Sequence, residues 1–151
     1  MSPTAITLAV IFALISLQMI MSFLQLRRYQ KAVQLMRGSG ILGIGQRRGR
    51  IKPGEILILS YNRHSDKVVA CKSMRGYSAL ARFEDRTAYI GMTLAEARET
   101  GVARDAKELK GYRKKHPYDP KVLSKKKGAL IQAVEAIELR LRREAEEAEL
   151  D

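Results

Sequence analysis

Tryptophan is absent from this sequence, cysteine occurs once and histidine twice. A single cysteine, Cys71, excludes an intramolecular disulfide, and its place in an alternating apolar stretch predicts a small buried side chain in a reducing compartment. The two histidines, His64 and His116, are far apart in the sequence, and their surroundings suit neither a metal site nor a catalytic pair. We therefore expect a protein that is not an enzyme and that carries no metal and no cofactor.

Charge is absent from the N-terminal end, because residues 1–26 contain no Asp, Glu, Lys or Arg. Residues 6–26 are almost wholly apolar, and a helix of this length spans roughly 31 Å, close to the ~30 Å hydrocarbon thickness of a bilayer. This predicts a transmembrane helix. A buried core helix is a weaker alternative because the remaining chain has too little apolar surface to enclose it. A cleaved signal peptide is also weaker, because neither a basic N-terminal region nor a small-residue cleavage site is present.

Positive charge dominates the rest of the chain, whose formal net charge is +12. Residues 27–128 contain 25 Lys and Arg against 9 Asp and Glu, and the cations begin at Arg27, directly after the apolar stretch. The positive-inside rule therefore predicts a single-pass protein of the inner (cytoplasmic) membrane, with its N-terminus outside and its bulk in the cytoplasm. A surface this basic has two polyanions as candidate partners, the anionic lipid membrane and DNA.

Five short apolar runs follow the apolar helix, with turn-forming residues between them, at positions 41–44, 55–61, 67–73, 77–83 and 87–92. This pattern predicts an α+β protein with an N-terminal transmembrane helix, a small, mainly antiparallel β-sheet or barrel, and a C-terminal coiled-coil-like helix. A sheet domain this small, without a disulfide or a metal, is marginally stable alone. We therefore expect a homo-oligomer or docking on the membrane.

Composition divides the chain into five segments. Residues 1–26 form the transmembrane helix, and residues 27–38 form an amphipathic helix at the membrane surface, which Gly38 ends. Residues 39–101 form the cytoplasmic β-rich domain, whose last element is a short helix that begins with a capping box at Thr93 and ends at Gly101. Residues 102–123 are a basic linker, and residues 124–151 are a C-terminal amphipathic helix.

The C-terminal helix carries a narrow apolar seam with steps of four, three and four residues, which is typical of coiled coils. The seam consists of Leu130, Val134, Ile137 and Leu141. The charges of this helix oppose its own dipole, because lysines crowd its N-terminus and glutamates crowd its C-terminus. An antiparallel neighbour would set each end against the opposite charge, so the seam predicts self-association or a partner helix. The alternative is a frayed, solvent-exposed tail.

The most distinctive cluster of cations surrounds Gly49 and consists of Arg47, Arg48, Arg50 and Lys52. Cations around a glycine at the entrance to a strand can grip phosphate, so we expect a nucleic-acid or anionic-surface binding site here. The alternative is an exposed basic turn that faces lipid headgroups. No helix-turn-helix pattern accompanies the cluster, so specific reading of bases is not predicted. The glycines at 38, 40 and 43 follow a helix and lead into strands, so their dinucleotide-like spacing predicts no nucleotide site.

The order of these motifs resembles the glucitol operon activator (GutM) family. An apolar helix, a glycine-rich stretch, a Gly-Arg-aliphatic-Lys-Pro segment, a Met-basic-Gly segment and an Ala-Arg pair follow one another. The matching residues are Gly40, Gly43 and Gly45; Gly49, Arg50, Ile51, Lys52 and Pro53; Met74, Arg75 and Gly76; Ala81 and Arg82; and Gly91, Met92 and Leu94. The resemblance covers residues 6–94, and the basic linker and C-terminal helix look like additions to it.

The resemblance implies an activator of genes for glucitol (sorbitol) utilisation. Together with the membrane anchor expected from composition, this predicts a membrane-anchored transcriptional regulator. Such a protein would act by contact with another regulator or by holding DNA phosphate with the cations around Gly49. A second function stays open, in which the chain is a membrane accessory or scaffold protein that binds a component of a sugar phosphotransferase transport system.

Overall fold

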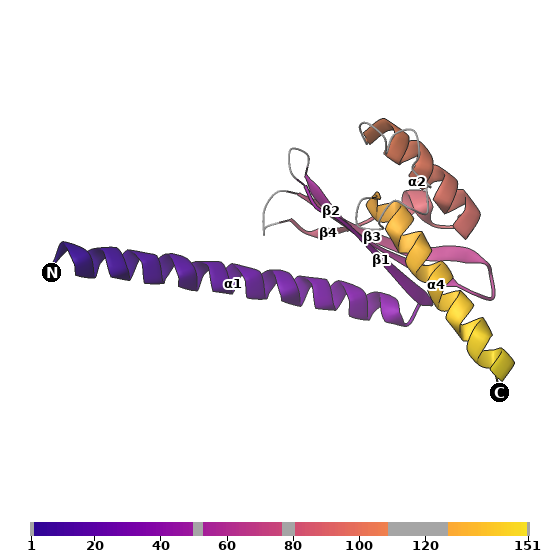
Figure 1. Cartoon of the computed structure of the whole chain (residues 1–151), viewed down its shortest axis with the longest axis horizontal. Helices are drawn as coiled ribbons and strands as arrows, with labels where there is room; N and C mark the ends of the chain where they lie inside the picture. Colours follow the sequence, from indigo (N-terminus) through magenta and orange to yellow (C-terminus); the bar gives the residue numbers. More distant parts are fainter. Residues whose placement is uncertain (1, 50–52, 77–80, 109–126, 151) are drawn as a thin grey trace.

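The computed structural model describes residues 2–49, 53–76, 81–108 and 127–150. Figure 1 shows a long helix that extends well beyond a small sheet, with further helices packed on that sheet. The α+β class expected from the sequence is confirmed. The described elements, in chain order, are α1 (Pro3–Arg37), β1 (Ile41–Arg47), β2 (Gly54–Asn62), β3 (Lys67–Gly76), β4 (Phe83–Asp85), η1 (Thr87–Tyr89), α2 (Leu94–Glu108) and α4 (Ala129–Leu150).

α1 begins at a capped N-terminus, where the Ser2 side chain accepts a hydrogen bond from the backbone N–H of Ala5 and Pro3 is the first helical residue. The helix then runs without an internal glycine or proline to Arg37, and Gly38 follows as its C-cap. The expected transmembrane and amphipathic segments are therefore one continuous helix. Its apolar part is long enough to cross a membrane, and none of the residues in its 18-residue apolar window is buried within the protein.

The four strands form one antiparallel sheet in the order β1-β2-β3-β4. β1 and β4 are its edges, so among the described residues the sheet is open rather than closed into a barrel. β2 is buried along most of its length, as its continuous apolar run predicts, and pairs with both β1 and β3. In the β2–β3 turn, Asn62 Oδ1 accepts hydrogen bonds from the backbone N–H groups of His64 and Ser65.

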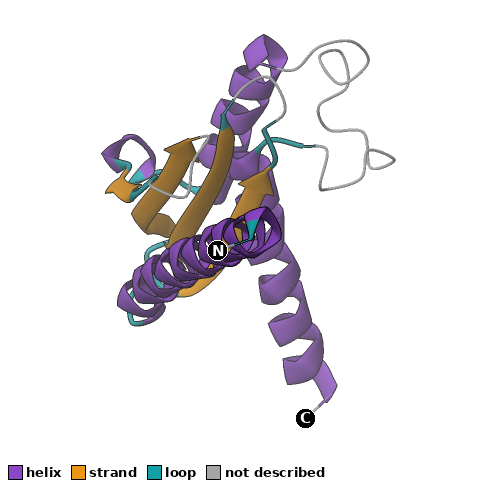
Figure 2. Cartoon of the chain, turned by 90° about the vertical axis from the view of Figure 1, so that its left-hand side faces the viewer, coloured by secondary structure: helices purple, strands orange, loops and turns teal. Residues whose placement is uncertain are grey.

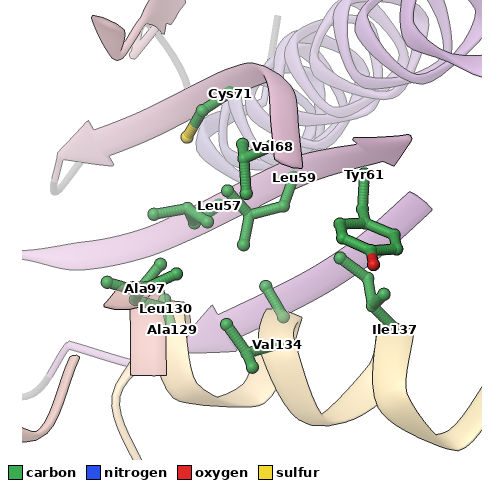
Figure 3. Close-up of a cluster of buried hydrophobic side chains, with 11 residues drawn as sticks. Leu57, Leu59, Tyr61, Val68, Cys71, Ala97, Ala129, Leu130, Val134 and Ile137 are labelled. Carbon is green, nitrogen blue, oxygen red and sulfur yellow. The ribbon is translucent and has the colours of Figure 1, made fainter. Parts of the chain in front are cut away.

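α1 and α4 cover opposite faces of the sheet (Figure 2). On one face, Ala32 and Met36 of α1 pack against Leu42 and Ile58. On the other face, β2 and β3 pack against α2 and α4 in the larger core cluster (Figure 3). Its buried members include the only cysteine, whose expected burial is confirmed. They are Leu57, Leu59, Tyr61, Val68, Cys71, Ala97, Ala129, Leu130, Ala133, Val134 and Ile137.

The strand expected at residues 87–92 is wrong. Thr87–Tyr89 form a single 3-10 turn, and Gly91 has a φ of +87°, a backbone conformation that turns the chain out of a strand and that glycine adopts without strain. This segment still contacts β3 at one residue, because the Gly91 N–H donates to the Val68 carbonyl and the Val68 N–H donates to the Met92 carbonyl, both at 2.8 Å.

α2 does not end at Gly101 but continues to Glu108, so residues 102–108 of the expected linker are helical. The predicted capping box is confirmed, because the Thr93 N–H donates to Glu96 Oε2 (2.8 Å) and the Glu96 N–H donates to Thr93 Oγ1 (3.3 Å). Gly101 serves close packing instead, since a Cβ there would lie 2.8 Å from Cγ1 of Ile131 on α4. The rest of the expected linker, residues 109–123, lies outside the described residues.

Candidate functional site

The described part of the basic turn, Arg47, Arg48 and Gly49, lies beside α1. Arg47 is the last residue of β1, Arg48 follows it and is exposed, and Arg50 and Lys52 lie outside the described residues. A hollow of about 300 Å³ is lined by Arg48, by Gln46 and by Gln25 of α1. Gln25 is the second-last residue of the apolar segment at 6–26. The turn is therefore placed where the apolar part of α1 ends and its basic part begins.

Arg47 belongs to a cluster of charged side chains that joins the β1–β2 hairpin to α2. Its Nη1 atom lies 2.5 Å from Oε2 of Glu108, and its side chain is only 13% exposed. Arg104 pairs with the same Glu108 (3.2 Å) and with the buried Glu55 of β2 (2.6 Å). The predicted site is thus divided, because Arg47 is held by an internal carboxylate while Arg48 faces solvent.

The pKa shifts in this cluster favour its charged state. Burial disfavours the cationic form of Arg104, but hydrogen bonds to Glu55 and Glu108 outweigh this effect and raise the pKa of Arg104. Burial likewise acts against ionisation of Glu108, but its hydrogen bonds with Arg47 and Arg104 prevail and lower the pKa of Glu108. Arg104 and Glu108 are therefore held in their charged forms, and the cluster acts as a polar clamp between the hairpin and α2.

The predicted seam of α4 packs against the sheet of its own chain. Leu130, Val134 and Ile137 are fully buried in the core cluster (Figure 3). Leu141 is half-buried at its margin. The expectation that this seam pairs with a second helix therefore needs correction, since the chain's own β1 and β2 occupy it.

Two glycines of β1 explain why the sheet accepts α4 so closely. A Cβ at Gly43 would lie 2.0 Å from the carbonyl oxygen of Ala133, and a Cβ at Gly45 would lie 1.7 Å from that of Ala129. Both distances are far below contact, so only glycine allows the helix backbone to rest on the strand. The signal in the sequence is a pair of small residues two apart, which fits one face of a strand, together with alanines four apart on a helix.

The unfavourable charge at the start of α4 is compensated by α2. The Gly128 N–H, at the N-terminus of α4, donates to Oδ2 of Asp105 at 2.7 Å, and Asp105 is buried. Burial raises the pKa of Asp105, while the bond from Gly128 acts in the opposite direction. Lys127 forms an ion pair with Glu135. The sequence concealed this arrangement because Asp105 stands in a stretch that looks like a basic linker.

Within the described ranges, no three His, Cys, Asp or Glu side chains gather closely enough to hold a metal ion. The charged side chains that do gather, around Arg47 and Arg104, form ion pairs with one another, although the Nη2 atom of Arg47 is buried without a hydrogen-bond partner among the described residues.

Comparison with known proteins finds a family match that covers about the first two-thirds of the chain. The sequence profile of a family described as "Glucitol operon activator protein (GutM)" matches residues 6–111. The chain belongs to the GutM family. The resemblance found from the motifs is confirmed, and the match runs from α1 through the sheet and α2, whereas α4 lies beyond it. No curated protein and no solved structure matches the chain.

Proposed function

We propose that this GutM-family chain is a membrane-anchored, non-enzymatic activator of glucitol (sorbitol) utilisation genes that works by contact with another protein at the inner face of the membrane. The match of residues 6–111 to the glucitol operon activator family carries the proposal. The surfaces of α1, of the basic turn and of α4 support the manner of action.

The surface of α1 supports the membrane anchor. Large apolar side chains are exposed along its N-terminal part, including Phe12, which is 73% exposed. Burying such side chains in lipid is worth about 1.5–3 kcal/mol each relative to water. At the end of the apolar part, the guanidinium of Arg27 lies over the ring of Phe23, 5.0 Å from its centre, an amphipathic pair suited to a membrane–water interface. The cations that follow favour a cytoplasmic position for the rest of the chain.

The surfaces beyond the membrane favour protein contact over direct reading of DNA. Arg47 is engaged with Glu108, so fewer cations of the basic turn face outward than the sequence suggests. The outer turns of α4 are rich in glutamate, which repels a polyanion. α2 is packed against α4 through Ala97 and Gly101. Phosphate attraction by Arg48, Arg50 and Lys52 remains a sequence-independent contribution.

A transcription reporter tests the activator role. A promoter of glucitol utilisation genes from the same organism is fused to a reporter in cells that lack the chain, and the full chain is then restored. We expect reporter output in the presence of glucitol to fall without the chain and to recover with it. Unchanged output together with reduced glucitol uptake would overturn the activator role and favour the transport scaffold.

A gel-shift experiment separates protein contact from DNA contact. The full chain in nanodiscs of neutral lipid is mixed with promoter DNA and with scrambled DNA across a salt series. We expect no preference for the promoter, and any binding to fall steeply and equally with salt. A clear preference for the promoter DNA would contradict action by protein contact alone.

A further inference from the structure

The two edges of the sheet differ in how well they are protected against strand addition. β4 is three residues long and carries Glu84 and Asp85, which are features that blunt an edge in natural sheets. β1 is seven residues long, and residues 41–46 contain no charged residue, no proline and no shift in register with β2. β1 is therefore the less protected of the two edges, and an added strand can pair with it more readily than with β4.

Gln132 of α4 shows which backbone groups of β1 face outward. Its Oε1 atom accepts a hydrogen bond from the N–H of Gln46 (3.3 Å), and its Nε2 atom donates to the carbonyl of Gln46 (3.0 Å). Backbone groups along an antiparallel strand point alternately toward and away from the partner strand. Because the backbone N–H and C=O groups of Gln46 point away from β2, those of Ile44 and Leu42 do so as well. Gln132 thus closes one end of the edge and leaves Ile44, which is 37% exposed, as its open centre.

A hollow of about 370 Å³ runs beside this part of β1, between α1 and α4. Val33 and Arg37 of α1 line one side, and Arg140 and Glu144 of α4 line the other. Glu144 pairs with Arg63 at 3.4 Å. Arg37 and Arg140 therefore set the sign of the charge in the hollow, with one cation on each wall. The apolar surface lies on Val33 of α1 and on Ile41, Leu42 and Ile44 of β1.

We propose that the β1 edge, centred on Ile44, binds an extended segment of a partner protein as an added strand. Successive side chains of a strand point to opposite faces, so two adjacent acidic residues of the segment reach Arg37 on one wall and Arg140 on the other. Apolar residues flank the acidic pair and contact Val33 and the exposed part of Ile44. This deepens the proposed function, because it rests on the partner contact proposed above and names the surface that makes it.

A second copy of this chain does not fit the same edge in one membrane. Two identical antiparallel edge strands are related by a two-fold axis perpendicular to the sheet. α1 lies along a sheet face, with Tyr29, Val33 and Met36 all packed against it, so its axis runs roughly parallel to the sheet. The two-fold axis would reverse the direction of α1 in the second copy. Two chains inserted in the same direction therefore cannot pair antiparallel through β1.

Peptide binding tests the proposal with the full chain in nanodiscs of neutral lipid. The probe is a fluorescent five-residue peptide, Val-Val-Glu-Glu-Val with blocked ends, and its matched control replaces both glutamates with lysine. We expect saturable binding of the acidic peptide, followed by fluorescence anisotropy, and at least tenfold weaker binding of the lysine peptide. The Arg37→Glu and Arg140→Glu double variant should reverse this preference. Equal binding of the two peptides, or none, would overturn the proposal.

Two substitutions act on the backbone edge in opposite directions. Ile44→Pro removes an N–H that faces away from β2, so pairing with β2 is kept while the added strand loses a hydrogen bond. We expect about fivefold weaker binding than for the matched Ile44→Ala. Gln132→Ala exposes the backbone of Gln46 and lengthens the edge, so we expect about fivefold tighter binding.

Protection of the buried Cys71 from alkylation verifies that each variant is folded. Equal binding by Ile44→Pro and Ile44→Ala, or weaker binding by a folded Gln132→Ala, would contradict strand addition. These measurements need no promoter, so their failure would leave the activator role standing, and failure of the reporter experiment would leave the peptide site standing.

Discussion

α1 and α4 are the two longest helices of the described chain, and each covers one face of the sheet before extending beyond it (Figure 1). The part of α1 beyond the sheet carries no charge and exposes large apolar side chains, such as Leu8 at 68%. The outer turns of α4 expose charged side chains instead. These are Arg142, Arg143, Glu144, Glu146, Glu147 and Glu149.

Under the proposed membrane anchor, the difference means that one sheet connects a helix in lipid with a helix end in water. An exposed apolar helix is costly in water and stable in lipid, whereas a charged helix end has the opposite preference. The attachments to the sheet differ as well. α4 is held at backbone contact by Gly43 and Gly45, while α1 packs through the side chains of Ala32 and Met36. α4 therefore depends on the sheet for its position, whereas under the proposed membrane anchor lipid gives α1 a second support.

The largest expected effect comes from placing charged side chains, like those on the outer turns of α4, in the apolar part of α1. Leu14→Arg combined with Leu17→Arg places two guanidinium groups in the middle of the apolar segment, at a cost of about 5–7 kcal/mol for membrane insertion. We expect the full-length variant to leave the membrane fraction in alkaline carbonate, while the unaltered chain stays.

The matched control places the same two side chains on the outer turns of α4, as Glu146→Arg with Glu147→Arg. These positions are exposed, so membrane association should not change. If the α1 variant stays in the membrane fraction in alkaline carbonate as the control does, α1 is not inserted in lipid.

The second expected effect concerns the attachment of α4. Gly45→Ala forces a Cβ into the carbonyl of Ala129, and we expect a loss of about 3 kcal/mol of unfolding free energy, measured by urea titration in detergent. Gly38→Ala is the matched control, because nothing lies within 4 Å of a Cβ at Gly38.

Alkylation of Cys71 measures the loosening of α4 locally. Burial raises the pKa of its thiol to about 12, so the folded chain should react slowly with alkylating reagents at neutral pH. Opening of the α4 face in Gly45→Ala should accelerate alkylation, and Gly38→Ala should not. Identical rates in the two variants would show that α4 does not depend on the glycines of β1.

The comparison also explains what the sequence could reveal. α1 was predictable because its evidence is local, an uncharged stretch of bilayer length, and β1 to β3 were predictable from their short apolar runs. The position of α4 was not, because a coiled-coil-like seam fits a sheet as well as it fits a second helix. What decides between them is Gly43 and Gly45, which stand far from α4 in the sequence and resemble turn glycines when read along the chain.

The basic turn shows the same limit for charged residues. The sequence alone does not distinguish the cations around Gly49 from one another. In the fold, Glu108 of α2 pairs with Arg47, whereas Arg48 is exposed. Ion pairs between distant segments depend on tertiary contacts that no local pattern contains. The clamp around Arg104 was missed for this reason.

A smaller effect is expected at the start of α4. Asp105→Ala removes the acceptor of the buried Gly128 N–H, which should cost about 1–3 kcal/mol of unfolding free energy. Asp105→Asn keeps an acceptor oxygen and removes the cost of a buried charge, so its loss should be smaller. Urea titration of both variants in detergent measures the difference. Equal losses would show that the carboxylate charge, rather than the hydrogen bond, holds α4 at this end.

The smallest effect concerns the pH dependence of the clamp that joins α2 to the hairpin. Glu108 has a folded-state pKa below its ordinary value of 4.5, so its ionised form stabilises the fold. This contribution is complete above pH 4.5 and is lost as the pH falls through the folded-state pKa. Glu108→Gln removes it, so we expect the variant to be less stable than the parent at pH 7 and the gap to narrow below pH 4.5.

The pKa shift of Asp105 has the opposite sign to that of Glu108. Burial raises the pKa of Asp105, so the fold favours its protonated form as the pH falls. The negative charge of Glu108 contributes to this raised pKa, so the difference between the urea midpoints of the parent and Glu108→Gln at each pH reports Glu108 together with its effect on Asp105. A gap that stays constant from pH 7 to pH 3 would mean that the charge of Glu108 does not hold the clamp. The attachment of α2 would then rest on its apolar contacts with α4, the same kind of support that holds α1 against the opposite face.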